Sequence, residues 1–446
     1  MTIAQAGQAL RNGSLRCTEL VQHAIDAANQ LNPALNAFLC ITAEQALDRA
    51  KILDDELAAG RDRGALHGIP IAHKDLICTK GVRTTSGSKL FADYVPDYDA
   101  TVVKQLDAAG AVSIGKLGLH ECAYGVTSNN PHYGAVRNPW DTERIPGGSS
   151  GGSGAAVASG VVFMATGTDT GGSIRIPAAY CGTAGFKPTY GLVSRRGVRP
   201  LGFSLDHVGP LARTVDDIEI TMRAIASMRP VKPPATIRVG VPENYYCDRI
   251  DPEVKAALQN TARIAESAGA RIMNVTVPDV DALNTIGRVI LLAEASAALE
   301  NHMGDRASFG PDVLALLDQG RLISATEYIN AQRVRKQLVR RFQELFESID
   351  LLLTPTLPIV APKIGQSTVD LAGVETDTRL ATTRFVRGIN VLGLPALSLP
   401  CGLSANRLPI GAQLIGRAFE DELVLRFGKV MEGALGLSLK PPVAVL

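Results

Sequence analysis

The sequence lacks the features that mark several large classes of protein. Its 7 cysteines are odd in number and scattered, and no Cys-x-x-Cys pair occurs, which argues against a disulfide framework and a zinc knuckle. The first residues lack the basic and apolar segments of a signal peptide. The longest apolar run, residues 155–167, is shorter than the roughly 20 residues that a membrane-spanning helix needs. We therefore expect a soluble, cytoplasmic protein that binds no membrane.

An excess of charge of one sign is also missing. The chain has 45 Lys and Arg residues against 44 Asp and Glu residues, and no block of like charges marks a tail that binds nucleic acid. Hydrophobic residues make up 46% of the chain, which is too many for intrinsic disorder. The composition therefore predicts a folded protein and disfavours nucleic acid as a partner.

Helix and strand patterns alternate along the chain. Residues 100–109 favour a helix capped by Asp99, and residues 111–115 favour a buried strand. The same order recurs later as a strand at 237–241, a helix from 251 to about 269 and a strand at 271–277. Strand, helix and strand in this order predict right-handed parallel crossovers and hence an α/β fold.

Two helical segments stand outside this alternation. Residues 18–31 are amphipathic, and we expect that helix to stop near Pro33. Residues 280–345 are mainly helical and rich in charge. Because no Pro- or Ser-rich linker divides the chain, we expect residues 1–446 to form a single domain, with residues 280–345 as a helical cover.

Glycine is in excess, with 43 residues in 446, about one in ten against a usual level of about 7%. The densest part lies between residues 147 and 173 and contains Gly-Gly-Ser-Ser-Gly-Gly-Ser-Gly and Thr-Asp-Thr-Gly-Gly-Ser. Glycine destabilises regular elements by roughly 0.5–1 kcal/mol relative to alanine. So dense a cluster therefore indicates tight turns or a close approach of the backbone to another group.

Other motifs fit this block less well. It lacks the Gly-x-x-x-x-Gly-Lys-Ser/Thr pattern of a phosphate-binding loop. Residues 147–151 match the Gly-x-Ser-x-Gly pattern of a nucleophile elbow, but Asp206 and His207 are adjacent in sequence, an unhelpful arrangement for a relay. A surface linker is disfavoured because the following residues, 155–165, are apolar.

The block resembles the signature of the amidase signature family. Residues 147–191 carry the resemblance, with further matches in Gly-Ile-Pro-Ile-Ala-His-Lys-Asp from residue 68 and Gly-Ala-Gln-Leu-Ile-Gly from residue 411. The resemblance covers nearly the whole chain and is weakest over residues 280–345, where contacts with the substrate would be expected. It implies a single α/β/α domain around a large central mixed β-sheet.

The resemblance also implies a Ser-cisSer-Lys triad. Ser173 would be the nucleophile, Ser149 the bridging serine after a cis Gly148–Ser149 peptide bond, and Lys74 the terminal base. A serine hydroxyl becomes a good nucleophile only when a base removes its proton. Lysine is a base only when it is neutral, so we expect burial to lower the pKa of Lys74.

The residues around Ser173 have expected supporting roles. The backbone N–H groups of Thr170, Gly171, Gly172 and Ser173 can form an oxyanion hole. Three further side chains are expected to hold the loop without taking part in the reaction, Asp169 and Arg175 as a pair, together with Ser150.

These residues predict a serine hydrolase that cleaves an amide C–N bond through an acyl-enzyme, without a metal or cofactor. We favour a stand-alone monomer or homodimer that acts on a small-molecule substrate, a neutral aryl or alkyl amide or a carbamate, and binds no nucleic acid. The resemblance leaves one alternative enzyme, the A subunit of a glutamyl-tRNA amidotransferase, a glutamine amidohydrolase in a tRNA-bound complex. A binding module without activity is a third alternative, which the complete lysine–serine–serine set disfavours.

Overall fold

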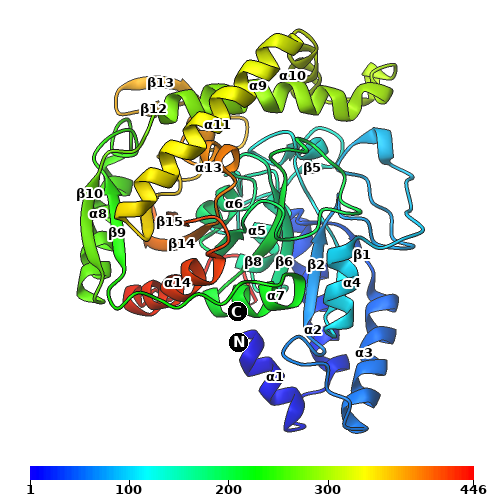
Figure 1. Cartoon of the computed structure of the whole chain (residues 1–446). Helices are drawn as coiled ribbons and strands as arrows, with labels where there is room; N and C mark the ends of the chain where they lie inside the picture. Colours follow the sequence, from blue (N-terminus) through cyan, green and yellow to red (C-terminus); the bar gives the residue numbers. More distant parts are fainter. Residues whose placement is uncertain (446) are drawn as a thin grey trace.

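A computed structural model describes residues 1–445 of the chain. An 11-stranded sheet forms its centre, in the strand order β1-β3-β2-β6-β8-β7-β14-β15-β11-β9-β10 (Figure 1). Its strands are β1 Phe38–Ile41, β2 Pro70–Lys74, β3 Val112–Leu117, β6 Met164–Asp169, β7 Ala184–Lys187, β8 His207–Ala212, β9 Arg238–Pro242, β10 Arg271–Val275, β11 Leu351–Pro355, β14 Ala396–Leu403 and β15 Pro409–Gly416. Two small hairpins lie outside the sheet, β4 Asn129–Asn130 with β5 Gly134–Ala135 and β12 Thr368–Leu371 with β13 Val374–Asp377.

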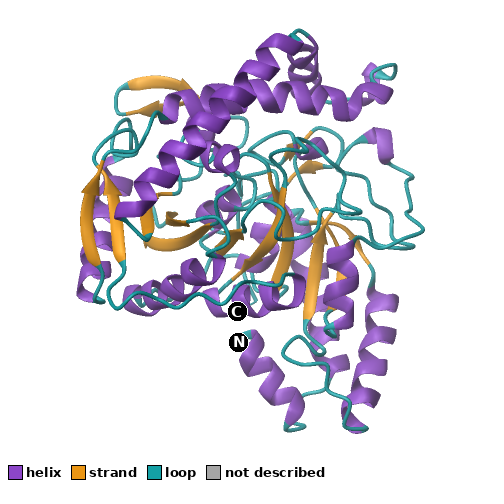
Figure 2. Ribbon diagram, in the orientation of Figure 1, coloured by secondary structure: helices purple, strands orange, loops and turns teal. Residues whose placement is uncertain are grey.

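Helices surround the sheet (Figure 2). They are α1 Ile3–Arg11, α2 Cys17–Leu35, α3 Ala43–Ala58, α4 Thr101–Ala108, α5 Gly151–Ala158, α6 Arg175–Cys181, α7 Val215–Ile225, α8 Pro252–Ser267, α9 Val280–Leu299, α10 Pro311–Arg321, α11 Ala325–Ser348, α12 Thr378–Thr383, α13 Arg387–Leu392 and α14 Asp421–Leu435. The sheet is mixed, because β2 pairs in parallel with β3 and β6 while β6–β8 and β14–β15 are antiparallel. The predicted α/β fold with a large central mixed sheet is confirmed.

The predicted crossovers are present. Strands β2 and β3 are parallel and are joined through α4, and β9 and β10 are parallel and are joined through α8. Each of these elements lies within a few residues of its predicted position, because caps, prolines and glycines mark helix ends in the sequence itself.

One detail of the predicted helices is confirmed and one is wrong. Helix α2 ends at Leu35, two residues after Pro33 and so near the predicted stop, and Asn36 follows it in the left-handed conformation. Proline is tolerated there because it lies in the last turn and the buried side chains of Leu31 and Leu35 hold that turn in place. Asp99 does not cap α4, since its carboxylate accepts a hydrogen bond from the Lys80 N–H at 2.7 Å instead.

The predicted helical cover is present as α9, α10 and α11, which lie together at the top of Figure 1. One segment, Val280–His302, is long and apolar enough to cross a membrane by length and composition, but 56% of its apolar window is buried inside the fold. Helix α9 in this segment packs against α10, α11 and α13. Its apolar residues are therefore explained by contacts within the protein.

The topology places two strand ends and two helix starts next to each other. Strand β2 ends at Lys74 beside its parallel neighbour β6, which ends at Asp169. Helix α5 begins just after Ser149, helix α6 begins just after Ser173, and the two helices pack together. The carboxyl ends of parallel strands share one edge of the sheet, so residues far apart in the sequence meet there.

Candidate active site

Lys74 contacts the first of the two predicted catalytic serines. Its side chain is completely buried, and its Nζ donates hydrogen bonds to Ser149 Oγ at 2.7 Å and to Thr168 Oγ1 at 2.8 Å. Sequence reasoning missed Thr168. The signal was present, because Thr166 and Thr168 put two hydroxyls on the same face of a wholly buried strand, where each needs a partner.

The surroundings of Lys74 favour its neutral form. Burial lowers the pKa of Lys74 from 10.5 to about 7, although the charges of Asp169 and Asp206 act in the opposite direction. Among residues 1–445, no carboxylate forms an ion pair with this ammonium group. A large fraction of Lys74 can therefore act as a base near pH 7, as the chemistry of a lysine base requires.

Backbone contacts hold the two serine loops together. The Ser150 N–H donates to the Ser173 carbonyl at 3.2 Å, and the Ser150 hydroxyl donates to the Thr168 carbonyl at 3.2 Å. The Gly148–Ser149 peptide bond is cis, as the resemblance implied. Within residues 1–445, no hydrogen bond joins the Ser149 and Ser173 hydroxyls. The structure thus brings the two serine loops together but does not show the contact through which Ser173 would pass its proton to Ser149.

The backbone before Ser173 offers fewer free donors than predicted. The Gly172 N–H donates to Asp169 Oδ1 at 2.7 Å, so its predicted place in an oxyanion hole is not observed. The N–H groups of Thr170, Gly171 and Ser173 form no hydrogen bond within residues 1–445. The Thr170 hydroxyl donates to Asp206 at 2.6 Å, which fixes the start of the loop. Of the four predicted backbone donors, Thr170, Gly171 and Ser173 therefore keep a free N–H group and Gly172 does not.

Glycine is required at position 172 for two reasons. The residue has a φ of +121°, a backbone conformation that residues with a side chain rarely adopt. A Cβ there would also lie 2.4 Å from Val386 Cγ2. Gly148 is also enclosed, since a Cβ there would lie 2.7 Å from the Val126 carbonyl carbon. The local excess of glycine thus reflects close packing around the two serines.

Asp169 and Arg175 form the expected pair behind Ser173. Both side chains are fully buried, and Nε and Nη2 of Arg175 each donate to the Asp169 carboxylate at 3.0 Å. Burial raises the pKa of Asp169, but the charge and hydrogen bonds of Arg175 outweigh this effect and lower it overall. Asn390 and Gln413 complete the network around Arg175, at 2.6 and 3.0 Å. Sequence reasoning missed both, since they lie more than 200 positions away in the chain.

The alternative of a nucleophile elbow is not supported. His207 contacts Lys187 through Nε2 at 3.1 Å and the Leu205 carbonyl through Nδ1 at 2.6 Å. Within residues 1–445 it forms no hydrogen bond with Ser149 or Ser173. Ser149 instead contacts a lysine, which agrees with the relay implied by the resemblance.

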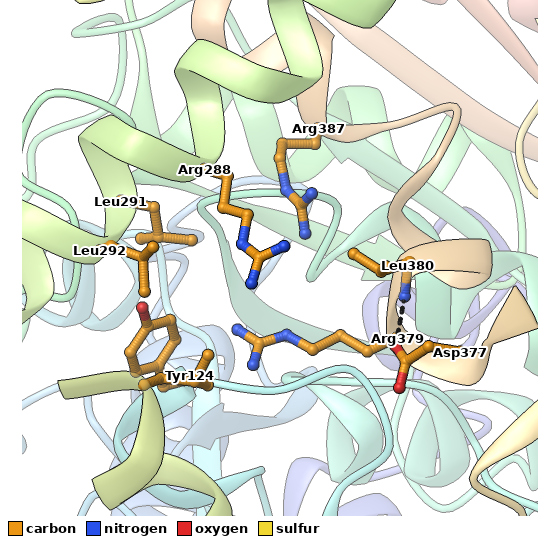
Figure 3. Close-up of a pocket in the computed structure, with 9 residues that line it drawn as sticks. Tyr124, Arg288, Leu291, Leu292, Asp377, Arg379, Leu380 and Arg387 are labelled. Atoms are coloured by element: carbon orange, nitrogen blue, oxygen red, sulfur yellow. Dashed lines mark hydrogen bonds between the residues drawn. The ribbon is translucent and has the colours of Figure 1, made fainter. Parts of the chain in front are cut away.

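Ser173 lines a narrow pocket that shares part of its wall with a larger one. Tyr124, Leu291, Arg379 and Arg387 line both the space at Ser173 and a cavity of about 370 Å³ beside it. The larger cavity is also lined by Arg288 from α9, so we call it the arginine pocket (Figure 3). The helical segment that was expected to contact the substrate thus contributes to this pocket.

Comparison with known proteins gives the family. The family model described as Amidase matches residues 19–425, nearly the whole chain. The chain belongs to the amidase signature family. A solved structure described as a vestigial protein complex that reveals the evolutionary origins of an s-triazine catabolic enzyme has 33% sequence identity and a TM-score of 0.92, over 97% of this chain and 98% of that one.

The curated relatives belong to a larger enzyme. The A subunit of glutamyl-tRNA(Gln) amidotransferase from Coxiella burnetii (strain Dugway 5J108-111) is 38% identical over 95% of this amidase and 95% of the relative. The corresponding protein from Chloroflexus aggregans (strain MD-66 / DSM 9485) is 40% identical over 96% of this chain and 95% of the relative. The chain is therefore similar in sequence to one component of a tRNA-dependent enzyme along nearly its full length.

These relatives overturn one prediction. The expectation of a stand-alone monomer or homodimer with a small amide or carbamate as its only partner and no nucleic acid is wrong, since the relatives are named as one component of a glutamyl-tRNA amidotransferase. The near-neutral net charge was a poor guide to nucleic acid as a partner, because net charge describes one chain as a whole. It does not report what a neighbouring protein in an assembly binds.

Proposed function

We propose that this amidase is the amide-hydrolysing component of a multi-subunit amidotransferase of the glutamyl-tRNA type. The observation that carries the proposal is the 38–40% identity to A subunits along nearly the whole length of both chains. Because the aligned region spans nearly the whole chain, it includes the central sheet, both serine loops and the helical cover. A cytoplasmic location and a reaction without metal or cofactor stay predictions.

The proposed reaction is acyl transfer to Ser173. Ser173 Oγ attacks the amide carbonyl carbon while its proton passes to Ser149 Oγ, whose own proton passes to neutral Lys74. Free N–H groups of the loop, those of Thr170, Gly171 and Ser173, stabilise the negative carbonyl oxygen. The proton then returns through Ser149 to the leaving nitrogen, the C–N bond breaks, and water hydrolyses the resulting ester. The contact of Lys74 with Ser149 supports this order of transfer.

The triad is tested by two substitutions in the purified enzyme. Ser173→Ala should abolish release of ammonia from an amide donor, because no acyl-enzyme can form, and should leave the thermal unfolding temperature unchanged. Lys74→Met should lower kcat by about 10²–10⁴-fold, the usual contribution of a general base. Mass spectrometry should detect an adduct on Ser173 in the wild type only. Normal turnover by Ser173→Ala contradicts the proposal.

The assembly is tested by isolation of the tagged chain from its native cells. We expect other proteins to copurify in fixed ratio, and glutamyl-tRNA to be converted only when they are present. A chain that elutes alone under gentle conditions, and that converts no tRNA with the extract added back, contradicts the assembly while leaving the triad intact.

The neutral aryl or alkyl amide or carbamate favoured by the sequence is the weaker candidate for the substrate. Leu291, Leu292 and Leu316 line the arginine pocket and suit an apolar group, but Arg288, Arg379 and Arg387 line the same space. Guanidinium groups are costly to desolvate against an uncharged ligand.

A further inference from the structure

The segment of residues 120–128 holds the backbone of the bridging serine in place. The His120 N–H donates to the Ser149 carbonyl at 3.1 Å, and the Ser128 hydroxyl donates to the same carbonyl at 3.3 Å. Ser128 Oγ also accepts the Gly151 N–H at 3.2 Å. The backbone on the C-terminal side of Ser149 is therefore fixed by hydrogen bonds from this one segment.

Side chains of the same segment contact the start of helix α10 in the helical cover. Glu121 Oε2 accepts the Gly310 N–H at 2.7 Å, and His120 Nε2 lies 2.8 Å from Asp312 Oδ2. Gly310 is the N-cap of α10, and Asp312 lies in its first turn. The first N–H groups of a helix have no partner within the helix, so a carboxylate is a favourable acceptor there. We call His120, Glu121, Gly310 and Asp312 the latch.

Glu121 joins further segments to the latch. Its side chain is completely buried, and Oε1 accepts the Ser88 hydroxyl at 2.7 Å and contacts His132 Nε2 at 2.9 Å. Three donors from different parts of the chain therefore converge on one buried carboxylate. Among residues 1–445, no group of three or more His, Cys, Asp or Glu side chains could hold a metal ion. Hydrogen bonds between segments thus account for this cluster.

The two sides of the latch are closely packed. A Cβ at Gly125 would lie 2.1 Å from His120 Nε2, and a Cβ at Gly310 would lie 2.7 Å from Glu121 Oε2. Both distances are well below ordinary van der Waals contact, so neither glycine leaves room for a side chain. Interiors packed this densely transmit displacements, so a movement of α10 would reach the segment that holds Ser149.

The latch also lies between two walls of the space for the substrate. Ala123 and Tyr124 line the narrow pocket at Ser173, and Leu316 of α10 lines the arginine pocket. Cys122 and Ala123 have φ values of +49° and +59°. This left-handed conformation is uncommon outside glycine and persists only where surrounding contacts hold it. The adjacent latch supplies such contacts.

We propose that the latch couples the position of the helical cover to the catalytic relay. His120 and Glu121 are positioning residues. While α10 is in place, they fix the segment that holds the Ser149 carbonyl, and Ser149 stays in contact with Lys74. When the contact with α10 is lost, this support is lost as well. The inference rests on the proposed function for the chemistry of the relay and adds a condition under which the relay works.

Two substitutions at Asp312 separate the latch from the stability of the cover. The Asp312 side chain is 55% exposed, so Asp312→Ala and Asp312→Asn should both fold. Asparagine can still accept a hydrogen bond from His120, whereas alanine cannot. Asp318→Ala is the matched control, because Asp318 lies on the same helix and pairs with Arg306 at 2.7 Å instead.

Hydrogen exchange followed by mass spectrometry reads the coupling without a substrate, on the full chain together with any proteins that copurify. We expect Asp312→Ala to speed amide exchange at the start of α10 and also at residues 147–154, by roughly 5–150-fold, the usual range for coupled sites. Asp312→Asn should have a smaller effect, and Asp318→Ala should act within α10 only. The inference is overturned if Asp312→Ala leaves residues 147–154 unchanged, or if either other variant speeds their exchange equally.

Labelling of Ser173 by phenylmethanesulfonyl fluoride reads the relay itself. Ser173 Oγ bonds to sulfur, fluoride leaves, and the hydroxyl proton passes to Ser149, so the rate depends on the relay and not on the natural substrate. We expect Asp312→Ala to slow labelling by roughly 5–150-fold and Asp318→Ala to change it by less than about twofold. Labelling of Asp312→Ala at the wild-type rate overturns the inference and leaves the triad standing. A wild type that is not labelled at Ser173 contradicts the proposed function, and the exchange measurement then decides on the latch.

Discussion

At the scale of single residues, burial of Lys74 is what makes the predicted chemistry feasible. The side chain is fully enclosed, and its two hydrogen-bond partners are hydroxyls. A carboxylate at either position would hold the lysine in its charged form and would remove the base. Ser149 and Thr168 satisfy the hydrogen-bonding capacity of the amine without adding charge.

This arrangement predicts the pH dependence of the reaction. Because burial lowers the pKa of Lys74 to about 7, protonation below that pH removes the base. We expect kcat/KM to fall about tenfold per pH unit below pH 7 and to level off above it. The measurement is a profile from pH 5 to 9 on a substrate whose own charge does not change in this range. A flat profile contradicts the role of Lys74 as the base.

At the scale of elements, the contact between α9 and α10 determines where the wall of the arginine pocket lies. A Cβ at Gly320 in α10 would lie 2.0 Å from the Leu292 carbonyl oxygen and 2.2 Å from Ser296 Oγ. Leu292 and Arg288 are on the same helix and line the pocket. The absence of a side chain at position 320 therefore allows α10 to press directly on the backbone of α9.

Gly320→Ala should force these helices apart. We expect the free energy of unfolding in urea to fall by about 1–3 kcal/mol, the usual cost of overpacking, and KM to rise more than kcat falls. The control is Gly433→Ala in α14, where a Cβ would meet nothing within 4 Å. That variant should be more stable by about 0.5–1 kcal/mol, because alanine favours helix over glycine. Equal effects of the two substitutions would argue against the close contact.

At the scale of the whole molecule, one sheet joins the two halves of the chain. Strands β1 to β8 come from the first half and β9 to β15 from the second, and the β7–β14 ladder connects them. The main hydrophobic core likewise extends from Ile3 to Met431. Strand β7 would be an edge strand of the first half and β14 an edge strand of the second if the two did not pair with each other. This pairing agrees with the prediction that residues 1–446 form a single domain.

Equilibrium unfolding tests that prediction. Trp140 is the only tryptophan, is 8% exposed, and donates from Nε1 to the Cys181 carbonyl at 2.8 Å. Its fluorescence reports on that local packing, while far-UV circular dichroism reports on all helices and strands. We expect the two urea transitions to coincide, as in a cooperative single domain. Separated midpoints would show that the chain divides into independent units.

Much of the fold and the outline of the site could be predicted from local sequence. Alternating patterns with caps and glycines predicted α4, β3, β9, α8 and β10, because their signals lie within a few residues of each element. The glycine block and its resemblance to a family pointed to Ser149, Ser173 and Lys74. The error at Asp99 arose because its hydrogen bond with the Lys80 N–H overrides the local preference for a helix cap.

The sequence by itself determined the fold class and the type of chemistry, since both depend on residue types at short spacing. Only the tertiary structure decided that Lys74 is buried against Ser149 and Thr168, that Gly172 donates to Asp169, and that three arginines meet beside Ser173. Arg288 and Arg387 lie about 100 positions apart, and nothing in their local sequence relates them. The pKa of a base and the charge of a pocket depend on what surrounds a group in space, which packing of distant segments alone supplies.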